Sequence, residues 1–265
     1  MSSWRSNHGL SGDSGPLRIL KGLRVLVTRP AHGHADNWAA ALAAAGATAL
    51  SYPTIEVLPP PSWEPLDEAL RQIGRYDCII FTSQSTVASA ASRLEGGCFS
   101  AWGARPRVAT VGAETARALK RAGSHVDLVP SDQRQEGLID AFRDLETGTR
   151  LLFLHAVAGR DTLIEALRGR GCKVDVVAAY QTVPRRPLPP APAFDVATFA
   201  SPSALQAFVA SHGTRTLANK TVAVIGPTTA AEAVRHGLQP VIAAEPNIDA
   251  LISAIASTRT SQGGH

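Results

Sequence analysis

Short turns that carry hydroxyl groups follow several apolar segments of this 265-residue chain. Hydroxyl groups and the backbone N–H groups of a helix start suit carboxylates or phosphates, because the helix dipole and its unsatisfied donors favour negative charge. Ser, Thr and Pro are also ordinary helix caps, and for any single turn this structural interpretation stays open. Several such turns at one edge of a sheet would favour an anion-binding site. The turns are Thr28-Arg29-Pro30, Thr82-Ser83, Gly112 to Thr115, Ser201-Pro202-Ser203 and Gly226 to Thr229.

Tyr180 is one of only three tyrosines, and it stands shortly before a proline-rich segment. A phenol can donate a proton to a leaving hydroxyl group, or it can hold a ligand through a hydrogen bond. Packing in a core is the alternative for this side chain. His155 also ends an apolar segment and could act as an acid or base, although a structural role is favoured there.

Motifs for metals and common cofactors are absent from the sequence. It has no GxGxxG, GxxxxGK[ST], GxSxG or HExxH pattern, which argues against dinucleotide cofactors, Walker-type loops, hydrolase elbows and zincin sites. His32 and His34 have no accompanying cluster of ligands, so we interpret them as loop residues. None of the three cysteines has CxxC spacing, and Cys78 and Cys172 belong to apolar runs typical of a core.

The composition favours a small-molecule substrate over nucleic acid or membrane. Hydrophobic residues make up 45% of the chain, charged residues 18%, and the formal net charge is +4. No run of Lys and Arg is longer than two, which argues against a nucleic-acid partner. No apolar stretch is long enough for a membrane helix, and residues 1–20 are typical of a disordered tail rather than a signal peptide. We therefore expect a cytoplasmic location.

Short β-branched segments alternate with longer segments of helical period. A strand followed by a helix, six times over, is typical of a parallel α/β fold, in which ligands bind at the carboxyl ends of the strands. The hydroxyl-bearing turns fall at those ends. The predicted strands are residues 23–28, 77–83, 107–112, 150–155, 195–201 and 221–226. Glycines expected just past the helices are Gly46, Gly123, Gly171, Gly213 and Gly237.

The chain also repeats itself, in the order a, b, c, a, b, c. The first a unit, which contains Leu42, resembles the second, which contains Leu167. YDCIIFTSQSTV resembles FDVATFASPSAL, and VATVGAETARALKRAG resembles VAVIGPTTAAEAVRHG. The repeat indicates an internal duplication that produced two similar, flavodoxin-like lobes.

Proline clusters at residues 57–65 and 183–192 follow the two a units. Proline is excluded from central strands and favours extended segments, so these clusters indicate two crossings between the lobes. Two crossings would form a two-stranded hinge beside a ligand-binding cleft. The predicted parts are a tail at 1–20, one lobe at 21–55 plus 190–258, another at 58–180, and connectors at 53–60 and 180–190.

Motifs along most of the chain resemble those of the uroporphyrinogen-III synthase family of tetrapyrrole biosynthesis. Each motif is short, but their order is specific, and together they cover roughly residues 23–256. They are VLVTRP with YPTIEV, DCIIFTSQSTV, VATVG with GLIDAF, GRDTLIEAL with VVAAYQTV, FASPSAL, and VIGPTTAAEAVRHGLQP.

The resemblance implies a lyase that cyclises hydroxymethylbilane to uroporphyrinogen III, with loss of water and inversion of the last ring. It implies a monomer without cofactor or metal, and two lobes joined by a two-stranded connector. Tyr180 falls on the family's favoured catalytic tyrosine, as proton donor to the leaving hydroxyl or as its orienting partner. The residues implied to hold substrate carboxylates are Thr82, Ser83, Thr115, Ser201, Thr228 and Thr229. We add Arg29 and Arg160 as cations beside two of these turns, with a solvated surface role as the alternative.

Two positions depart from the family pattern. His155-Ala156 stand where relatives often have Arg-Gly, and Ser85-Thr86 stand where many have Asn-Ala. Ligand contacts through the backbone would survive both changes.

Two alternatives come from other functional classes. A non-catalytic bilobal binding protein would share the hinge and the cleft, but such proteins are usually exported. A nucleotide-sugar transferase should show acidic pairs at a strand end, whereas Asp77 and Asp195 stand at strand starts.

Overall fold

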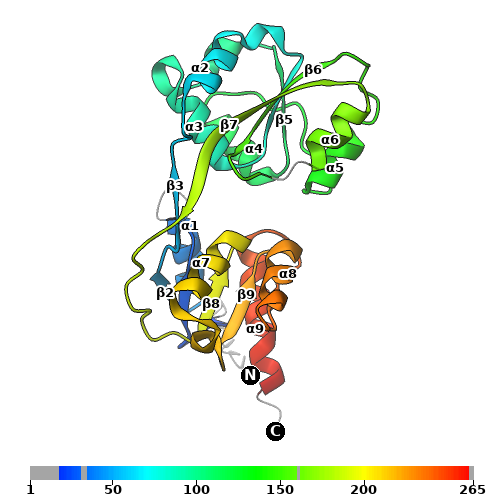
Figure 1. Cartoon of the computed structure of the whole chain (residues 1–265). Helices are drawn as coiled ribbons and strands as arrows, with labels where there is room; N and C mark the ends of the chain where they lie inside the picture. The colour runs from blue at the N-terminus through cyan, green and yellow to red at the C-terminus, as the bar shows by residue number, and fades with distance from the viewer. Residues whose placement is uncertain (1–17, 31–34, 160–161, 263–265) are drawn as a thin grey trace, which may run out of the picture. The chain divides into compact units, whose positions relative to one another are not determined.

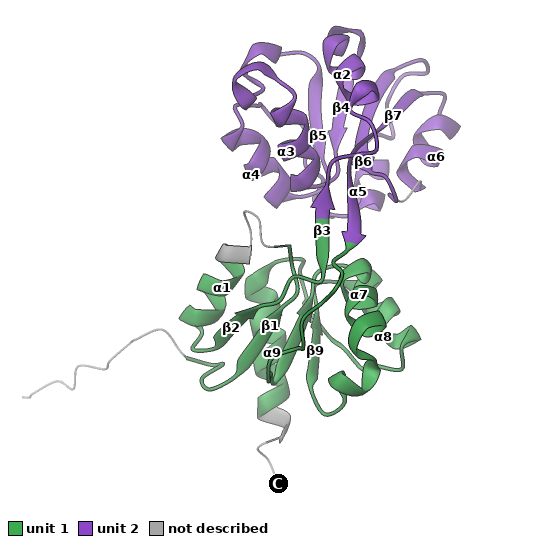
Figure 2. Cartoon of the chain, turned by 60° about the vertical axis from the view of Figure 1, so that its left-hand side comes forward, with its two compact units in different colours: residues 1–56, 184–265 green, residues 57–183 purple. Residues whose placement is uncertain are grey.

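The structure is a computed structural model that describes residues 18–30, 35–159 and 162–262. The chain separates into two compact units (Figures 1 and 2), of which unit 1 consists of residues 1–56 and 184–265 and unit 2 of residues 57–183. Each unit contains a mostly parallel sheet with helices on both faces, which confirms the α/β class expected from the sequence. None of the helices within the described ranges is both long enough and apolar enough to cross a membrane.

Unit 1 contains one sheet between two layers of helices. Its elements are β1 (Arg24–Val27), α1 (Ala35–Ala44), β2 (Thr48–Ser51), β8 (Val196–Phe199), α7 (Pro202–His212), η4 (Thr214–Leu217), β9 (Thr221–Val224), α8 (Pro227–Arg235), β10 (Val241–Ile242) and α9 (Ile248–Gln262). The strands pair in parallel in the order β10-β9-β8-β1-β2. Helices α7 and α8 pack on one face of this sheet, and α1 and α9 pack on the other.

Unit 2 has the same layered arrangement. Its elements are β3 (Ile55–Leu58), which begins in unit 1, then α2 (Glu64–Arg71), η1 (Ile73–Arg75), β4 (Cys78–Phe81), α3 (Gln84–Ser92), η2 (Glu95–Gly97), η3 (Ser100–Trp102), β5 (Arg107–Thr110), α4 (Ala113–Arg121), α5 (Gln135–Ala141), β6 (Arg150–Ala156), α6 (Thr162–Gly169) and β7 (Lys173–Pro184). The strand order is β3-β7-β6-β4-β5, and β4, β5, β6 and β7 pair in parallel. Helices α2, α3 and α4 cover one face, and α5 and α6 cover the other.

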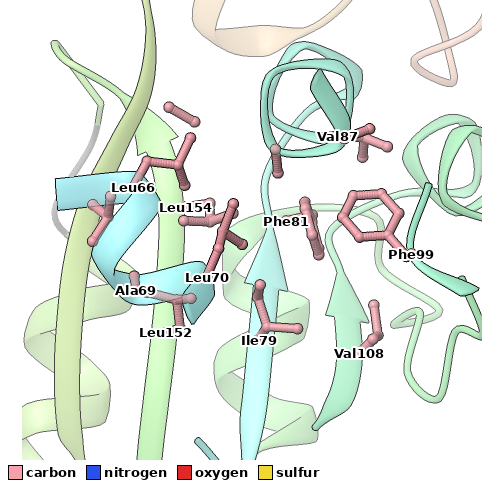
Figure 3. Packing of buried hydrophobic residues seen from close by; sticks show 14 of the residues in the cluster. Leu66, Ala69, Leu70, Ile79, Phe81, Val87, Phe99, Val108, Leu152 and Leu154 are labelled. Atoms are coloured by element: carbon pink, nitrogen blue, oxygen red, sulfur yellow. The ribbon is translucent and has the colours of Figure 1, made fainter. Parts of the chain in front are cut away.

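The apolar strands form because parallel sheets bury both of their faces. All four residues of β4 are buried, and so are all four of β8. Figure 3 shows the cluster on the α2 side of unit 2, where Phe81 of β4 lies beside Phe99, and Val87 of α3 belongs to the same cluster. Burial of such side chains contributes most of the stabilisation of these units.

All six strand–helix pairs expected from the sequence are present. The five glycines expected past the helices have φ values of 72° to 90°, a backbone conformation that L-residues rarely adopt. Helices α2, α5 and α9 are not among the six predicted pairs.

The strands that match in the sequence repeat also match in sheet position. The order β2-β1-β8-β9 in unit 1 corresponds to β7-β6-β4-β5 in unit 2. The chain direction across the sheet reverses between β1 and β8 in one unit and between β4 and β6 in the other. The duplication, the hinge and the expected lobe boundaries remain predictions.

Candidate active-site residues

Each unit places hydroxyl-bearing turns beside its point of strand reversal. Ligands of doubly wound α/β sheets bind at the carboxyl ends of the strands at such points, because the loops there diverge to opposite faces. In unit 2 the helix after β4 lies on one face and the helix after β6 on the other. In unit 1 the helices after β1 and β8 diverge in the same way.

Tyr180 and Ser83 lie together in unit 2. The Ser83 hydroxyl donates a hydrogen bond to the Tyr180 hydroxyl oxygen at 3.2 Å. Ser83 follows β4 and Tyr180 lies on β7, so the contact spans the point of reversal. Both side chains are half-buried, which leaves part of each accessible to a ligand.

A bulge in β7 turns Tyr180 toward Ser83. His155 is level with Ala178 but the next residue, Ala156, is level with Tyr180, so β7 carries one extra residue. A bulge of this kind changes the face on which the following side chains lie. As a result the consecutive residues Ala179 and Tyr180 both contact the core cluster on the α2, α3 and α4 face.

Ser83 is held by the helix that it begins. Its side chain accepts a hydrogen bond from the Thr86 N–H at 3.2 Å, and the Thr86 hydroxyl accepts one from the Ser83 N–H at 3.3 Å. This reciprocal pair is a capping box. Thr82, the preceding residue, donates to the Leu154 carbonyl of β6 at 3.1 Å and thereby ties the turn to the neighbouring strand.

In the β5–α4 turn of unit 2, the groups that a ligand could bind are backbone N–H groups rather than the side chain of Thr115. Thr115 is the third residue of α4, and its side chain is buried, with 6% of the residue exposed. The Gln133 side-chain oxygen accepts a hydrogen bond from the Ala113 N–H at 2.9 Å. Gln133 therefore supplies an acceptor at the positive end of α4, where a carboxylate would also be favourable.

In unit 1 the edge between β1 and β8 is largely closed by its own hydrogen bonds. Thr28 donates to the Thr198 carbonyl at 2.7 Å, and Thr198 donates to the Leu26 carbonyl at 2.9 Å. Ser201 begins α7, where its hydroxyl accepts from the Ala204 N–H at 3.3 Å and lies 3.0 Å from the Ser203 hydroxyl. These groups fix the edge, and Ser201 is half-buried.

Arg29, the cation expected beside this edge, lies over an aromatic ring. Its guanidinium carbon is 4.7 Å from the ring centre of Trp38 in α1. Arg29 itself is half-buried, whereas Trp38 is buried. A guanidinium on an aromatic face keeps its N–H groups directed around the ring plane, where they can meet a carboxylate.

The β9–α8 turn has no side-chain cap. Gly226 is the residue before α8, and Pro227 is the first residue of the helix. Thr228 follows and is exposed, whereas Thr229 is buried with 3% of the residue exposed. Thr228 is thus the side chain of this turn that a ligand can reach, and Thr229 offers its backbone.

Several further side chains considered in the sequence fall elsewhere. Arg160, His32 and His34 lie outside the described residues. His155 is half-buried in β6, and Gly159 passes so close to its ring that a Cβ at 159 would lie 2.3 Å from Nδ1. Among the described residues, no group of His, Cys, Asp and Glu could hold a metal ion.

The cysteines in the two apolar runs are core residues. Cys78 is 5% exposed and Cys172 is 6% exposed. Burial raises the pKa of the Cys78 thiol to about 12, so it stays protonated at neutral pH. A protonated, buried thiol is a poor nucleophile.

The amino ends of the strands carry structural carboxylates. Asp195 accepts the Arg24 N–H at 2.8 Å, and Asp77 accepts the Arg150 N–H at 2.8 Å. A cavity of about 420 Å³ opens at this edge of unit 2 and is lined by Asp77 and Cys78. The cavity contains none of the predicted site residues, and strand order argues for a site at the opposite edge.

Sequence reasoning missed two residues at the candidate site. Thr86 was noted only as a departure from the family pattern, although a Ser followed three residues later by a hydroxyl side chain is close to a capping-box signature. Gln133 stands 20 residues from the N–H that it binds. No local pattern could have joined those two residues.

Comparison with known proteins identifies the family and agrees with the fold. A sequence model of the family described as "Uroporphyrinogen-III synthase HemD" matches residues 36–253. The uroporphyrinogen-III synthase of Synechococcus elongatus is 38% identical over 165 residues, an alignment that covers 62% of this chain and 62% of that protein. The porphyrin biosynthesis protein HemD of Ruminiclostridium josui is 30% identical over 252 residues, covering 89% of this chain and 48% of that protein.

A solved structure has the same fold. The crystal structure of a mutant uroporphyrinogen III synthase from Thermus thermophilus aligns with a TM-score of 0.58 at 17% identity, covering 92% of this chain and all of that one. Since the family model spans most of the chain, we conclude that the protein belongs to the uroporphyrinogen-III synthase family.

Proposed function

We propose that the chain cyclises hydroxymethylbilane to uroporphyrinogen III, with loss of water and inversion of the last ring. Uroporphyrinogen-III synthases are hydro-lyases, and membership of the family supports the same reaction class here. The observation that carries the proposal is the pair of hydroxyl groups of Ser83 and Tyr180 beside the point of strand reversal. No cofactor or metal is required by the chemistry below.

In the first step Tyr180 supplies a proton to the hydroxyl group that leaves. The carbon–oxygen bond of the hydroxymethyl group breaks, the electron pair goes to that oxygen, and the oxygen departs as water. Electron density from the nitrogen of the pyrrole that carries the hydroxymethyl group replaces the lost bond and gives an electrophilic azafulvene that keeps its N–H proton. A positioned acid contributes typically about 10² to 10⁴ in rate.

In the second step the geometry of binding decides the product. The azafulvene carbon is attacked by the substituted carbon of the last ring, which forms a spiro intermediate. That intermediate fragments and recloses with the last ring inverted, and loss of a proton restores aromaticity and the tyrosine acid. Closure without positioning would give the isomer in which no ring is inverted, so much of the catalysis is orientation.

Binding of the substrate carboxylates is proposed for both sheet edges. The bilane has eight carboxylates, which need hydrogen-bond donors and a few cations. In unit 2 the proposed contacts are the Thr82–Ser83 turn and the first turn of α4 at Thr115, through backbone N–H groups where the hydroxyl protons are already bonded. In unit 1 they are Ser201, the Thr228–Thr229 turn and Arg29, with Arg160 of unit 2 as a further cation. The burial of Thr115 and Thr229 favours contacts through their backbone N–H groups.

We also propose a monomer in the cytoplasm with no nucleic-acid partner. The absence of long runs of Lys and Arg supports the last point. The matching strand orders of the two sheets support an origin by duplication. We propose that the boundaries between the lobes and the connectors lie at the proline clusters of residues 57–65 and 183–192.

The decisive experiment is a product analysis without cofactor. Hydroxymethylbilane is generated in situ, the purified protein is added, the products are oxidised, and uroporphyrin isomers I and III are separated by chromatography. We expect isomer III to predominate, whereas buffer and heat-denatured protein should give isomer I. Isomer I alone, from protein shown to be folded by circular dichroism, would overturn the proposal and leave a binding protein as the interpretation.

A further inference from the structure

The hydroxyl group and the backbone N–H of Thr86 both form hydrogen bonds to Ser83. Thr86 is fully buried, at 0% exposure, in the first turn of α3. Its hydroxyl donates to the Ser83 carbonyl at 2.5 Å and accepts from the Ser83 N–H at 3.3 Å. Its own N–H donates to the Ser83 hydroxyl oxygen at 3.2 Å. Three hydrogen bonds therefore join Thr86 to Ser83, whose hydroxyl is bonded to that of Tyr180.

These bonds hold Ser83 in place beside Tyr180. A serine hydroxyl has one proton and two acceptor lone pairs. The Thr86 N–H occupies one lone pair of the Ser83 oxygen, and the Thr86 hydroxyl bonds to the Ser83 N–H and carbonyl, so both the backbone and the side chain of Ser83 are held. In this position the Ser83 hydroxyl donates to the Tyr180 oxygen at 3.2 Å. Within the described residues, this is the hydrogen bond that the Tyr180 hydroxyl makes, and in it Tyr180 accepts.

The corresponding turn of unit 1 lacks a hydroxyl that bonds to the backbone of its capping serine. Ser201 also caps its helix, but the residue three positions on is Ala204, which has no hydroxyl. The Ser201 hydroxyl lies 3.0 Å from the Ser203 hydroxyl instead, and either oxygen can be the donor. The hydrogen bond from the backbone N–H of the capping serine to the side chain three residues later is thus present at the Ser83 turn, and Ala204 cannot provide it at the Ser201 turn.

We propose that Thr86 is a positioning residue that fixes Ser83 as a hydrogen-bond donor to Tyr180, so that the phenol keeps its own proton for the leaving hydroxyl of the substrate. The inference rests on the proposed function for its catalytic part. A bond donated to the phenol oxygen also stabilises the negative charge that remains there after proton transfer. Thr86 would act through Ser83 and would not touch the substrate.

The first test measures turnover in three variants of Thr86. Thr86→Val keeps the shape but removes the hydroxyl, and we expect kcat to fall roughly 10-fold with KM unchanged, as for loss of one hydrogen bond to a developing charge. Thr86→Ser should restore most of kcat, and Thr86→Ala should resemble Thr86→Val. Thr149→Val is the matched control, because the hydroxyl of Thr149 in unit 2 donates to the Glu146 carbonyl and, among the described residues, is not bonded to any residue proposed for the site.

A double-mutant cycle separates positioning from a general loss of stability. In the Tyr180→Phe background the Thr86→Val change should have no further effect on kcat, because the group that it positions is gone. Multiplicative effects of the two changes would overturn the proposal. So would an unchanged kcat in Thr86→Val assayed well below its melting temperature.

The second test does not depend on activity. With ¹³C-labelled tyrosine the three tyrosines give three Cζ resonances, and Tyr180→Phe identifies one of them. We expect the Tyr180 resonance to shift in Thr86→Val and Ser83→Ala and to return in Thr86→Ser, while those of Tyr52 and Tyr76 stay in place. An unmoved Tyr180 resonance would overturn the positioning role even if isomer III is formed. A shifted resonance without isomer III would preserve the contact and reject only the function.

Discussion

The two sheet edges differ in the hydrogen bonds of one pair of hydroxyl groups, although Thr82 of unit 2 also donates to a strand carbonyl. At the edge of unit 1, Thr28 and Thr198 are fully buried, and each donates to a carbonyl of the adjacent strand. At the edge of unit 2, Ser83 and Tyr180 are half-buried, and one hydroxyl donates to the other. The same strand order thus supports a closed polar edge in one unit and an accessible one in the other.

The difference shows how a hydroxyl becomes available for chemistry. A hydroxyl that donates to a backbone carbonyl has no transferable proton left, and removing it costs stability. A phenol that accepts from a serine retains its own proton and can give it to a ligand. We therefore assign proton transfer to unit 2, and we assign carboxylate binding to both edges.

Tyr180→Phe is the change with the largest expected effect on activity. It removes the proposed acid but keeps the ring in the core cluster, so turnover should fall by about 10²-fold or less, since water can partly replace the phenol. Steady-state kinetics of isomer III formation measures the loss.

Tyr52→Phe is the control in unit 1. The Tyr52 hydroxyl is bonded to the Pro189 carbonyl and lies 2.6 Å from His212 Nε2, and burial raises the pKa of this phenol. The control should lower the melting temperature and leave kcat unchanged. Equal turnover of Tyr180→Phe and the wild type would remove the catalytic assignment and the contrast between the edges.

The sequence predicted the turns at the carboxyl ends of the strands but not the contacts between side chains there. Ser83 and Ser201 could be found because each follows an apolar strand and precedes a helix, a local pattern with a local cause. The contact between Ser83 and Tyr180 depends on the bulge beside His155 and on a chain separation of 97 residues. Neither has a sequence signature in a single chain.

The sequence also did not predict which of the candidate side chains are buried. Thr115 and Thr229 were expected to hold carboxylates, and their type and spacing suited that role, but both side chains face their own cores. The helix phase that turns them inward follows from packing of α4 and α8 on the sheet. Arg29 was predicted as a solvated or ligand-binding cation, whereas its position over Trp38 required knowledge of α1 packing.

Glu232→Gln tests whether unit 1 depends on polar contacts behind its edge. Glu232 of α8 is 5% exposed, accepts from Gln206 of α7 at 2.9 Å and pairs with Arg235 at 2.6 Å. At pH 7 the variant should lose about 1–2 kcal/mol of unfolding free energy, because the charged acceptor is replaced by a neutral one. Urea unfolding followed by circular dichroism measures the loss.

The same variant should show a defined pH dependence. The Gln206 hydrogen bond, followed by Arg235, lowers the pKa of Glu232 below its usual 4.5. A lowered folded-state pKa means that the stabilisation is present above pH 4.5 and is lost as pH falls through the lower folded value. The difference between wild type and variant should therefore close in acid, and a gap that persists to pH 3 would contradict the role of the charge.

Thr198→Val tests whether the hydroxyl groups at the edge of unit 1 are purely structural. The change removes the hydroxyl that bonds to the Leu26 carbonyl but keeps the shape of a fully buried side chain. We expect a loss of about 1 kcal/mol of stability and no change in kcat. Ser83→Ala in unit 2 should lower kcat as well as stability, because Ser83 contacts Tyr180 and also caps α3. A fall in kcat for Thr198→Val in fully folded protein would show instead that the edge of unit 1 takes part in catalysis.

Thr228→Ala has the smallest expected effect and separates binding from capping. Thr228 is exposed in the second position of α8, and the residue before that helix is Gly226, which has no side-chain cap. Removal of the hydroxyl should therefore change stability by less than about 0.5 kcal/mol, as for most surface substitutions. Loss of one hydrogen bond to a substrate carboxylate should raise KM roughly threefold, with kcat unchanged. Thr221→Ala, at the opposite end of β9, is the control. A large fall in melting temperature would show instead that Thr228 supports the helix, and unit 1 would then contribute to binding at this turn through its backbone alone.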